Sequence, residues 1–205
     1  MTGKRAVLFD LGNVLIEWDP RLVYRTLFQD PAEMEHFLAD VCGADWNRAI
    51  DGGKPLMQSV RERQALWPRY AEMIGLWATR WRDMLPGAMP DSVAILKELK
   101  DQGTPIYALT NWSRETFPPT RERFAFLGWF KDIVVSGFEG LAKPDPALYR
   151  LTMERCGLVP AETVFVDDLQ LNIDAALTVG LDAVRFTGAP ALRQALVERG
   201  ILTPR

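Results

Sequence analysis

Short apolar runs alternate with stretches of helical periodicity along most of this chain, and several of the runs end in acidic or amide residues. Residues 6–9 form such a run, which ends in Asp10, and residues 163–166 form another, which ends in Asp167 and Asp168. Apolar runs of this length without polar alternation are typical of strands buried on both faces. Their alternation with helices predicts an α/β fold, a doubly wound parallel sheet.

Three further runs complete the predicted sheet, at residues 105–109, 132–136 and, more weakly, 183–186. Helical patterns lie between the runs at about 88–102, 114–126, 145–156, 170–179 and 189–199, and several are followed by glycine, which commonly ends a helix. Residues 1–16 and 87–205 are therefore predicted to form a Rossmann-like core domain.

Residues 17–86 break the alternation, because strand-like runs give way to aromatic and aliphatic residues at helical spacing. We expect an all-helical cap domain, inserted after the first strand and joined to the core by two crossings near residues 17–19 and 84–88. The segment 44–49 is interpreted as a cap loop that precedes a turn at Asp51, Gly52 and Gly53.

Composition excludes several classes of protein. The 205 residues carry a net charge of −3 without a basic stripe, which argues against a nucleic-acid partner. Apolar runs fall short of the ~18 residues of a membrane span, and two distant cysteines fit a reducing compartment, so we expect a soluble, cytoplasmic protein without a membrane partner. With His36 as the single histidine, catalytic triads and multi-histidine metal sites lack members.

Polar residues collect at the predicted strand ends. Ligands of parallel sheets bind beyond the carboxyl ends of the strands, so Asp10, Asn111, Asp167 and Asp168 should converge, with Lys143 nearby. Three carboxylates in one crevice repel one another unless a cation neutralises them. Hard oxygen ligands without histidine or cysteine favour Mg²⁺.

Four segments resemble, in order, the motifs of the haloacid dehalogenase superfamily. They are residues 9–14 (FDLGNV), 109–111 (LTN), 143–145 (KPD) and 166–168 (VDD). The resemblance covers nearly the whole chain, and it implies a magnesium-dependent phosphatase with a helical cap after the first strand.

The resemblance also implies a role for each motif. Asp10 would be the nucleophile that attacks phosphorus and forms an aspartyl-phosphate, and it would also bind the metal. The main-chain carbonyl of Gly12 would be a second metal ligand. Asp168 would bind the metal directly and Asp167 would hold a metal-bound water, although the two could exchange roles.

The other two motifs would bind the phosphoryl group. Thr110 and Asn111 would present a hydroxyl and backbone amides to its oxygens. Lys143, expected on a polar rim, would balance the charge of the nucleophile and of the phosphoryl group. Trp46, Arg48 and Trp112 are candidate contacts of the leaving group.

Gly12 departs from the resemblance, because most members carry at this position a second Asp that protonates the leaving oxygen and then activates water. A glycine cannot transfer a proton. The proton must then come from solvent, from the substrate or from a residue of the cap.

The function that these residues favour is hydrolysis of a small organophosphate, a sugar phosphate or similar, by a monomer or homodimer. One alternative is a metal-independent 2-haloacid dehalogenase, which would leave the Asp167–Asp168 pair poorly explained. The other is a non-catalytic module that binds a phosphate ligand.

Overall fold

A five-stranded parallel sheet organises the structure, a computed structural model that describes residues 6–204. The strands are β1 (Ala6–Phe9), β2 (Ile106–Thr110), β3 (Ile133–Val135), β4 (Thr163–Asp167) and β5 (Asp182–Arg185), in the spatial order β3-β2-β1-β4-β5. The predicted α/β class is confirmed, and all five strands lie within about a residue of their predicted positions. The strand order reverses at β1, so a crevice opens beyond the carboxyl ends of β1 and its neighbours.

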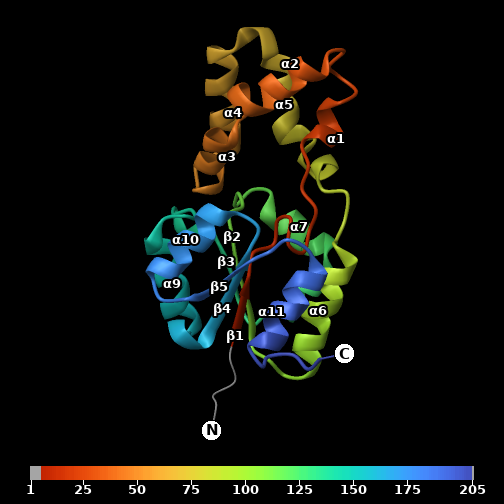
Figure 1. Ribbon diagram of the computed structural model, residues 1–205. Coiled ribbons are helices and arrows are strands. Elements are labelled where there is room, and N and C mark those ends of the chain that lie inside the picture. Colours follow the sequence, from red (N-terminus) through yellow and green to blue (C-terminus); the bar gives the residue numbers. More distant parts are fainter. Residues whose placement is uncertain (1–5, 205) are drawn as a thin grey trace.

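Helices cover both faces of the sheet. They are α6 (Pro90–Asp101), α7 (Phe117–Arg123), α8 (Ser136–Glu139), α9 (Pro146–Cys156), α10 (Gln170–Thr178) and α11 (Ala189–Glu198), with 3₁₀ turns η4 (Ala125–Trp129) and η5 (Pro160–Glu162). In Figure 1, α9 and α10 lie on one side of the strands and α6 and α11 on the other.

Alternation along β1 explains these two layers. Val7 and Phe9 belong to a buried cluster with residues of α6 and α11, whereas Leu8 belongs to a second cluster with residues of α9 and α10. Successive side chains of a strand point to opposite faces, so a wholly apolar strand needs cover on both sides. The run Ala6–Phe9 is accordingly buried along its whole length.

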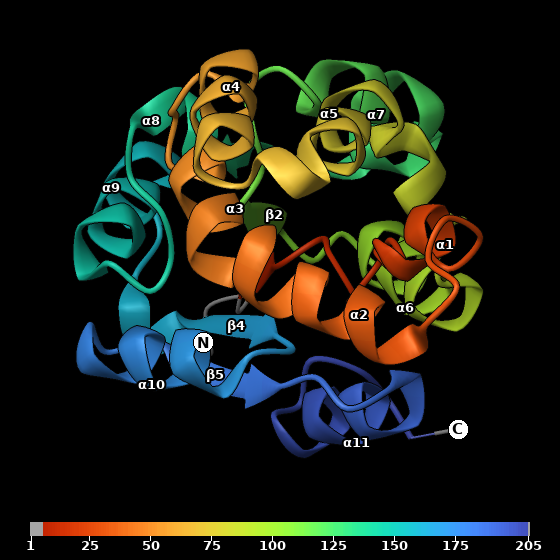
Figure 2. The ribbon, with the colours of Figure 1, turned by 90° about the horizontal axis from the view of Figure 1, so that it is seen from above.

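A group of helices lies beyond the carboxyl ends of the strands (Figure 1), and in the view from above β4 and β5 remain visible beside it (Figure 2). It comprises α1 (Arg21–Tyr24), α2 (Pro31–His36), the π-helical turn η1 (Phe37–Val41), α3 (Ala44–Asp51), α4 (Leu56–Leu66), η2 (Pro68–Tyr70), α5 (Ala71–Thr79) and η3 (Trp81–Met84). We call this group the cap.

The interpretation of residues 44–49 as a loop is wrong. These residues form most of α3, and the turn signal at Gly52 and Gly53 marks where that helix ends. Asp45 in the first turn complements the positive end of the helix dipole, and it forms an ion pair with Arg48. The helix buries Ile50 and Asp51 at its carboxyl end.

Aromatic side chains pack the interior of the cap. Trp77 lies fully inside it and contacts the rings of Trp18, Tyr24 and Trp46 at centroid distances of 6.3, 6.3 and 5.3 Å. Offset and edge-on pairs of this kind stabilise a small core beyond their buried area. Tryptophan is frequent in this chain, and most of its tryptophans therefore contribute to packing.

The two crossings between cap and core run side by side. The Glu17 amide donates to the Gly87 carbonyl at 3.0 Å, and the Asp19 amide donates to the Met84 carbonyl at 2.9 Å. On the core side, the Met89 amide donates to the Leu15 carbonyl at 2.9 Å. These three bonds pair backbone groups of one connection with backbone groups of the other.

A second contact joins the cap to the core at the loop between α3 and α4. The Ser136 hydroxyl donates to the Asp51 carbonyl at 2.6 Å, and the Arg114 guanidinium donates to the Gly53 carbonyl at 2.8 Å. The Leu56 amide in turn donates to the Glu115 carboxylate at 2.7 Å. The carboxyl end of α3 is thereby held against the loops that follow β2 and β3.

Within residues 6–204, no helix combines the length and the hydropathy that crossing a membrane requires.

Gly137 in α8 lets the backbone of residues 112–114 approach closely, and we expect this position to be sensitive to substitution. A Cβ atom there would lie 2.5 Å from the Arg114 amide nitrogen and 2.6 Å from the Trp112 carbonyl oxygen, both of which are backbone atoms. Gly137→Ala should lower the free energy of unfolding by about 1–3 kcal/mol in urea denaturation. Gly128→Ala is the matched control, because nothing lies within 4 Å of its Cβ position. Equal effects of the two variants would contradict this account.

Candidate active site

Asp10 lies at the carboxyl end of the central strand. Its amide donates to the Val166 carbonyl at 2.8 Å, which continues the pairing of β1 with β4, and its carboxylate oxygen Oδ1 accepts the Leu11 amide at 2.7 Å. The residue is 8% exposed. The sheet thus presents one carboxylate at its centre, held by backbone atoms and accessible on one side.

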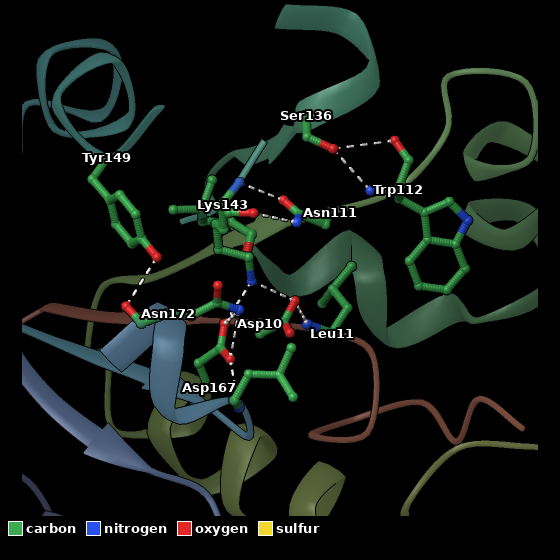
Figure 3. A network of polar contacts seen from close by, with 11 residues as sticks. Asp10, Leu11, Asn111, Trp112, Ser136, Lys143, Tyr149, Asp167 and Asn172 are labelled. Carbon is green, nitrogen blue, oxygen red and sulfur yellow. Dashed lines mark hydrogen bonds and ion pairs between the residues drawn. The ribbon is translucent and has the colours of Figure 1, made fainter. Parts of the chain in front are cut away.

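Lys143 lies between this carboxylate and that of Asp167 (Figure 3). Its Nζ atom is 3.0 Å from Asp10 Oδ1 and 2.6 Å from Asp167 Oδ2, and it also donates to the Leu109 carbonyl at 3.1 Å. The expected position on a polar rim is wrong, since Lys143 is 1% exposed. Three acceptors on three strand ends explain why a buried ammonium is tolerated here.

Asn111 fixes the loop that carries Lys143. Its side-chain oxygen accepts the Lys143 amide at 2.8 Å, and its side-chain nitrogen donates to the Lys143 carbonyl at 2.9 Å. Beside it, Thr110 is buried at the end of β2. The Asn111 side chain therefore holds the lysine loop, and the chain after β2 leaves its backbone at the edge of the crevice.

The adjacent acids after β4 have different surroundings. Asp167 is fully buried, and its two oxygens accept from the Leu169 amide, the Asn172 side chain and Lys143 at distances between 2.6 and 3.0 Å. Asp168 is half-buried and faces the same cavity as Asp10. Of the two acids, Asp168 is the one that lines the cavity.

Asn172 was not predicted from the sequence. It lies in the first turn of α10, and the Tyr149 hydroxyl donates to its carbonyl at 2.9 Å (Figure 3). The sequence does hold a signal for it, an amide residue shortly after the acid that ends a strand. A helix that follows a strand directs its first turn back toward the end of that strand, so such an amide can reach the acid.

Burial and like charges set the electrostatics of this cluster. Burial raises the pKa of Asp10 to about 7, the Asp167 and Asp168 carboxylates add to this, and Lys143 opposes it. Burial also raises the pKa of Asp168, with Asp167 adding to the effect. For Lys143, burial alone would lower the pKa, but the Asp10 and Asp167 carboxylates outweigh it and the pKa is raised.

The carboxylates fit a hard divalent cation. One oxygen from each of Asp10, Asp167 and Asp168 lies within 4.8 Å of the others, and the Lys143 ammonium pairs with two of these acids, Asp10 and Asp167. Oxygen donors with excess negative charge are the ligand set that Mg²⁺ takes in proteins. Asp10 and Asp168 face the cavity and could bind such an ion, whereas the oxygens of Asp167 are already hydrogen-bonded.

A cavity of about 490 Å³ lies between the sheet and the cap. From the core, its lining includes Asp10, Gly12, Asn111, Trp112, Lys143 and Asp168. From the cap and its crossings, the lining includes Trp18, Asn47, Arg48, Asp51, Trp77 and Trp81. Trp46 is not part of this lining, because its indole nitrogen donates to the Ser59 carbonyl at 3.3 Å inside the cap.

Asp51 is a second residue of this cavity that was not predicted as a site residue. It was interpreted only as part of a turn. Its position at the buried end of α3 follows from the docking of the cap, which a pattern along the chain does not reveal.

Comparison with known proteins identifies the family. A sequence profile of haloacid dehalogenase-like hydrolases matches residues 4–180. The chain belongs to this family. The predicted superfamily is thus confirmed, with a match that spans the first strand, the cap and the motifs that carry Asp10, Lys143 and Asp168.

Individual relatives of this haloacid dehalogenase-like hydrolase differ in their activities. Sesquiterpene phosphatase astK of Aspergillus oryzae is 29% identical over 93% of both chains. A family enzyme from Bacteroides thetaiotaomicron, solved with magnesium and inorganic phosphate, is similar in fold with a TM-score of 0.62 and 19% identity, over 89% of this chain and 94% of that one. L-2-haloacid dehalogenase from Xanthobacter autotrophicus has a TM-score of 0.66 and 18% identity, over 98% and 85%.

The pair of Lys143 and Asp167 should behave as one unit in the unfolding of this hydrolase. Lys143→Met removes the ammonium and leaves two buried carboxylates without a cation, so we expect the free energy of unfolding to fall by about 3–5 kcal/mol. Combining Lys143→Met with Asp167→Asn should recover part of that loss, because the second change removes one of the unpaired charges. Urea denaturation in chelator measures all three variants. Additive losses would show that the two residues act independently.

Proposed function

We propose that this hydrolase is a Mg²⁺-dependent phosphatase that cleaves a small organophosphate through an aspartyl-phosphate at Asp10. The observation that carries the proposal is the cluster of Asp10, Asp167 and Asp168 around Lys143, at the floor of the cavity between the sheet and the cap. Within the family, the name of the relative from Aspergillus oryzae supports phosphate chemistry.

The metal would be held by Asp10, by Asp168 and by the main-chain carbonyl of Gly12. When bound, Mg²⁺ supplies positive charge that lets the nucleophile approach an anionic phosphoryl group. Asp167 would act through Lys143 and the loop after β4, which its carboxylate holds in place. This division favours Asp168 over Asp167 as the direct ligand.

The residues of the chain perform the transfer. A carboxylate oxygen of Asp10 attacks phosphorus in line with the leaving oxygen, and the bond between phosphorus and the leaving oxygen breaks. Lys143 stabilises the negative charge near the nucleophile, and backbone amides after β2 can bind the phosphoryl oxygens. Water then hydrolyses the aspartyl-phosphate and regenerates Asp10.

The cavity suggests the kind of leaving group. Trp18, Trp77 and Trp81 form an aromatic wall, and Asn47 and Arg48 add polar groups. This combination suits a compact group with an apolar face and polar substituents, such as a sugar phosphate or similar ester. A screen should include isoprenoid monophosphates as well, because the relative from Aspergillus oryzae is named for a sesquiterpene substrate.

The dehalogenase alternative conflicts with the charges of the site. A 2-haloacid carries its own carboxylate, which would enter a cluster of three carboxylates in which the Lys143 ammonium already pairs with two. Like charges in a buried site repel strongly unless a cation is present. The similarity to the enzyme from Xanthobacter autotrophicus, at 18% identity, concerns the fold alone.

Metal removal tests the proposed function. With Mg²⁺, the protein should hydrolyse p-nitrophenyl phosphate, and excess chelator should abolish the activity until Mg²⁺ is restored, because the acidic cluster repels a phosphate dianion without the cation. Asp10→Asn should lower turnover by at least about 10³-fold while leaving the fold intact. Halide release from 2-chloropropionate is measured in parallel. Metal-independent halide release would favour the dehalogenase, and phosphate binding without any turnover would favour a non-catalytic module.

A further inference from the structure

The proposed phosphatase lacks an obvious proton donor beside its nucleophile. Gly12 has no side chain, nothing lies within 4 Å of its Cβ position, and its backbone is outside the left-handed region. The leaving oxygen of an alkyl phosphate is a strong base and needs a proton as its bond to phosphorus breaks. Another acid of the cavity must then supply that proton.

Asp51 meets the geometric requirements. It ends α3 in the cap, is 7% exposed, and lines the same cavity as Asp10 and Gly12. Its Oδ2 atom accepts the Asn47 side-chain amide at 2.9 Å, which orients the carboxyl group. Within residues 6–204, Asp51 forms no ion pair. No cation in direct contact therefore stabilises its ionised form.

Other acids of the cavity are committed elsewhere. Asp168 belongs to the metal-binding cluster. Asp19 and Glu35 both pair with the Arg21 guanidinium, and about half of the Glu35 side chain is exposed. Both are therefore partly exposed carboxylates in direct contact with a cation, unlike the buried Asp51.

The docking of the cap holds Asp51 in this position. The Ser136 hydroxyl binds its main-chain carbonyl at 2.6 Å, and Arg114 binds the Gly53 carbonyl at 2.8 Å. The side chain is left to face the cavity while its backbone is tied to the core. A group positioned in this way requires no reorganisation when the substrate is bound.

The protonation behaviour of Asp51 is compatible with proton transfer. Burial raises the pKa of Asp51 to about 7, and the Asp10 carboxylate adds to this. A backbone hydrogen bond at Ser113 and the ammonium of Lys143 oppose the shift. An acid is most effective when its pKa lies near the working pH.

We infer that Asp51 is the general acid and base of this hydrolase, supplied by the cap in place of a side chain at Gly12. In the first step, Asp10 forms a bond to phosphorus, the ester bond breaks, and the Asp51 proton moves to the leaving oxygen. In the second step, water attacks phosphorus and gives a proton to the Asp51 carboxylate. The bond to Asp10 breaks, phosphate leaves, and both aspartates are restored.

Leaving-group dependence tests this inference, which rests on the proposed phosphatase activity. Asp51→Asn should lower kcat/KM for an alkyl phosphate such as glycerol 1-phosphate by about 10²- to 10³-fold, and for p-nitrophenyl phosphate by less than about 10-fold. The nitrophenolate leaves without a proton, so its transfer to Asp10 does not need the acid. The ratio kcat/KM is used because it reports only the steps up to that transfer.

Asp40→Asn is the matched control, because Asp40 is an exposed carboxylate of the cap that pairs with His36 outside the cavity. It should leave kcat/KM for both substrates unchanged.

Gly12→Asp, added to Asp51→Asn, should raise kcat/KM for the alkyl phosphate at least about 10-fold above that of Asp51→Asn alone, because the backbone and the space at Gly12 accept a side chain.

The ratio of the kcat/KM values for the two substrates distinguishes loss of the acid from loss of folded protein. Partial unfolding of Asp51→Asn lowers both rates equally and leaves their ratio unchanged, and Asp51→Ala provides a second variant. Equal losses for the two esters, or no loss for the alkyl phosphate, would overturn the role of Asp51. A wild-type protein without Asp10-dependent hydrolysis of p-nitrophenyl phosphate would instead overturn the proposed function itself.

Discussion

The ammonium of Lys143 between Asp10 and Asp167 is the interaction on which the rest of the site depends. It connects the ends of β1 and β4 with the loop after β3, and it also contacts the end of β2 through the Leu109 carbonyl. Removing either carboxylate from water would be costly without this charge. The position of Asp10 and the convergence of four strand ends are therefore parts of one electrostatic arrangement.

That arrangement also explains why two adjacent acids after β4 are not equivalent. Asp167 points inward, where Lys143 and Asn172 occupy its oxygens, and Asp168 points toward the cavity. Successive residues at the end of a strand face opposite sides, so only one of the pair can reach a ligand. The inner acid holds the ends of the strands and loops together, and the outer one faces the cavity, where the proposed metal would bind.

Much of the fold could be predicted from the sequence because burial on both faces leaves uninterrupted apolar runs, such as Ala6–Phe9, and because ligands of parallel sheets bind at the strand ends. The burial of Lys143 could not, since it depends on partners in three other segments. Asp51 was overlooked for a related reason. Its helix ends in a glycine pair that resembles a loop. Its place in the cavity is set by two contacts between residues far apart in the sequence: Ser136 with Asp51, 85 positions apart, and Arg114 with Gly53, 61 positions apart.

Three hydrogen bonds between cap and core share one feature. In all three bonds at the loop after α3, the core contributes a side chain, from Ser136, Arg114 or Glu115, and the cap contributes only main-chain atoms. Main-chain atoms are present whatever residue occupies a position. The side chains of this cap loop can therefore change during evolution without loss of these three bonds. Substrate preference can then diverge while the cap keeps its position relative to the sheet.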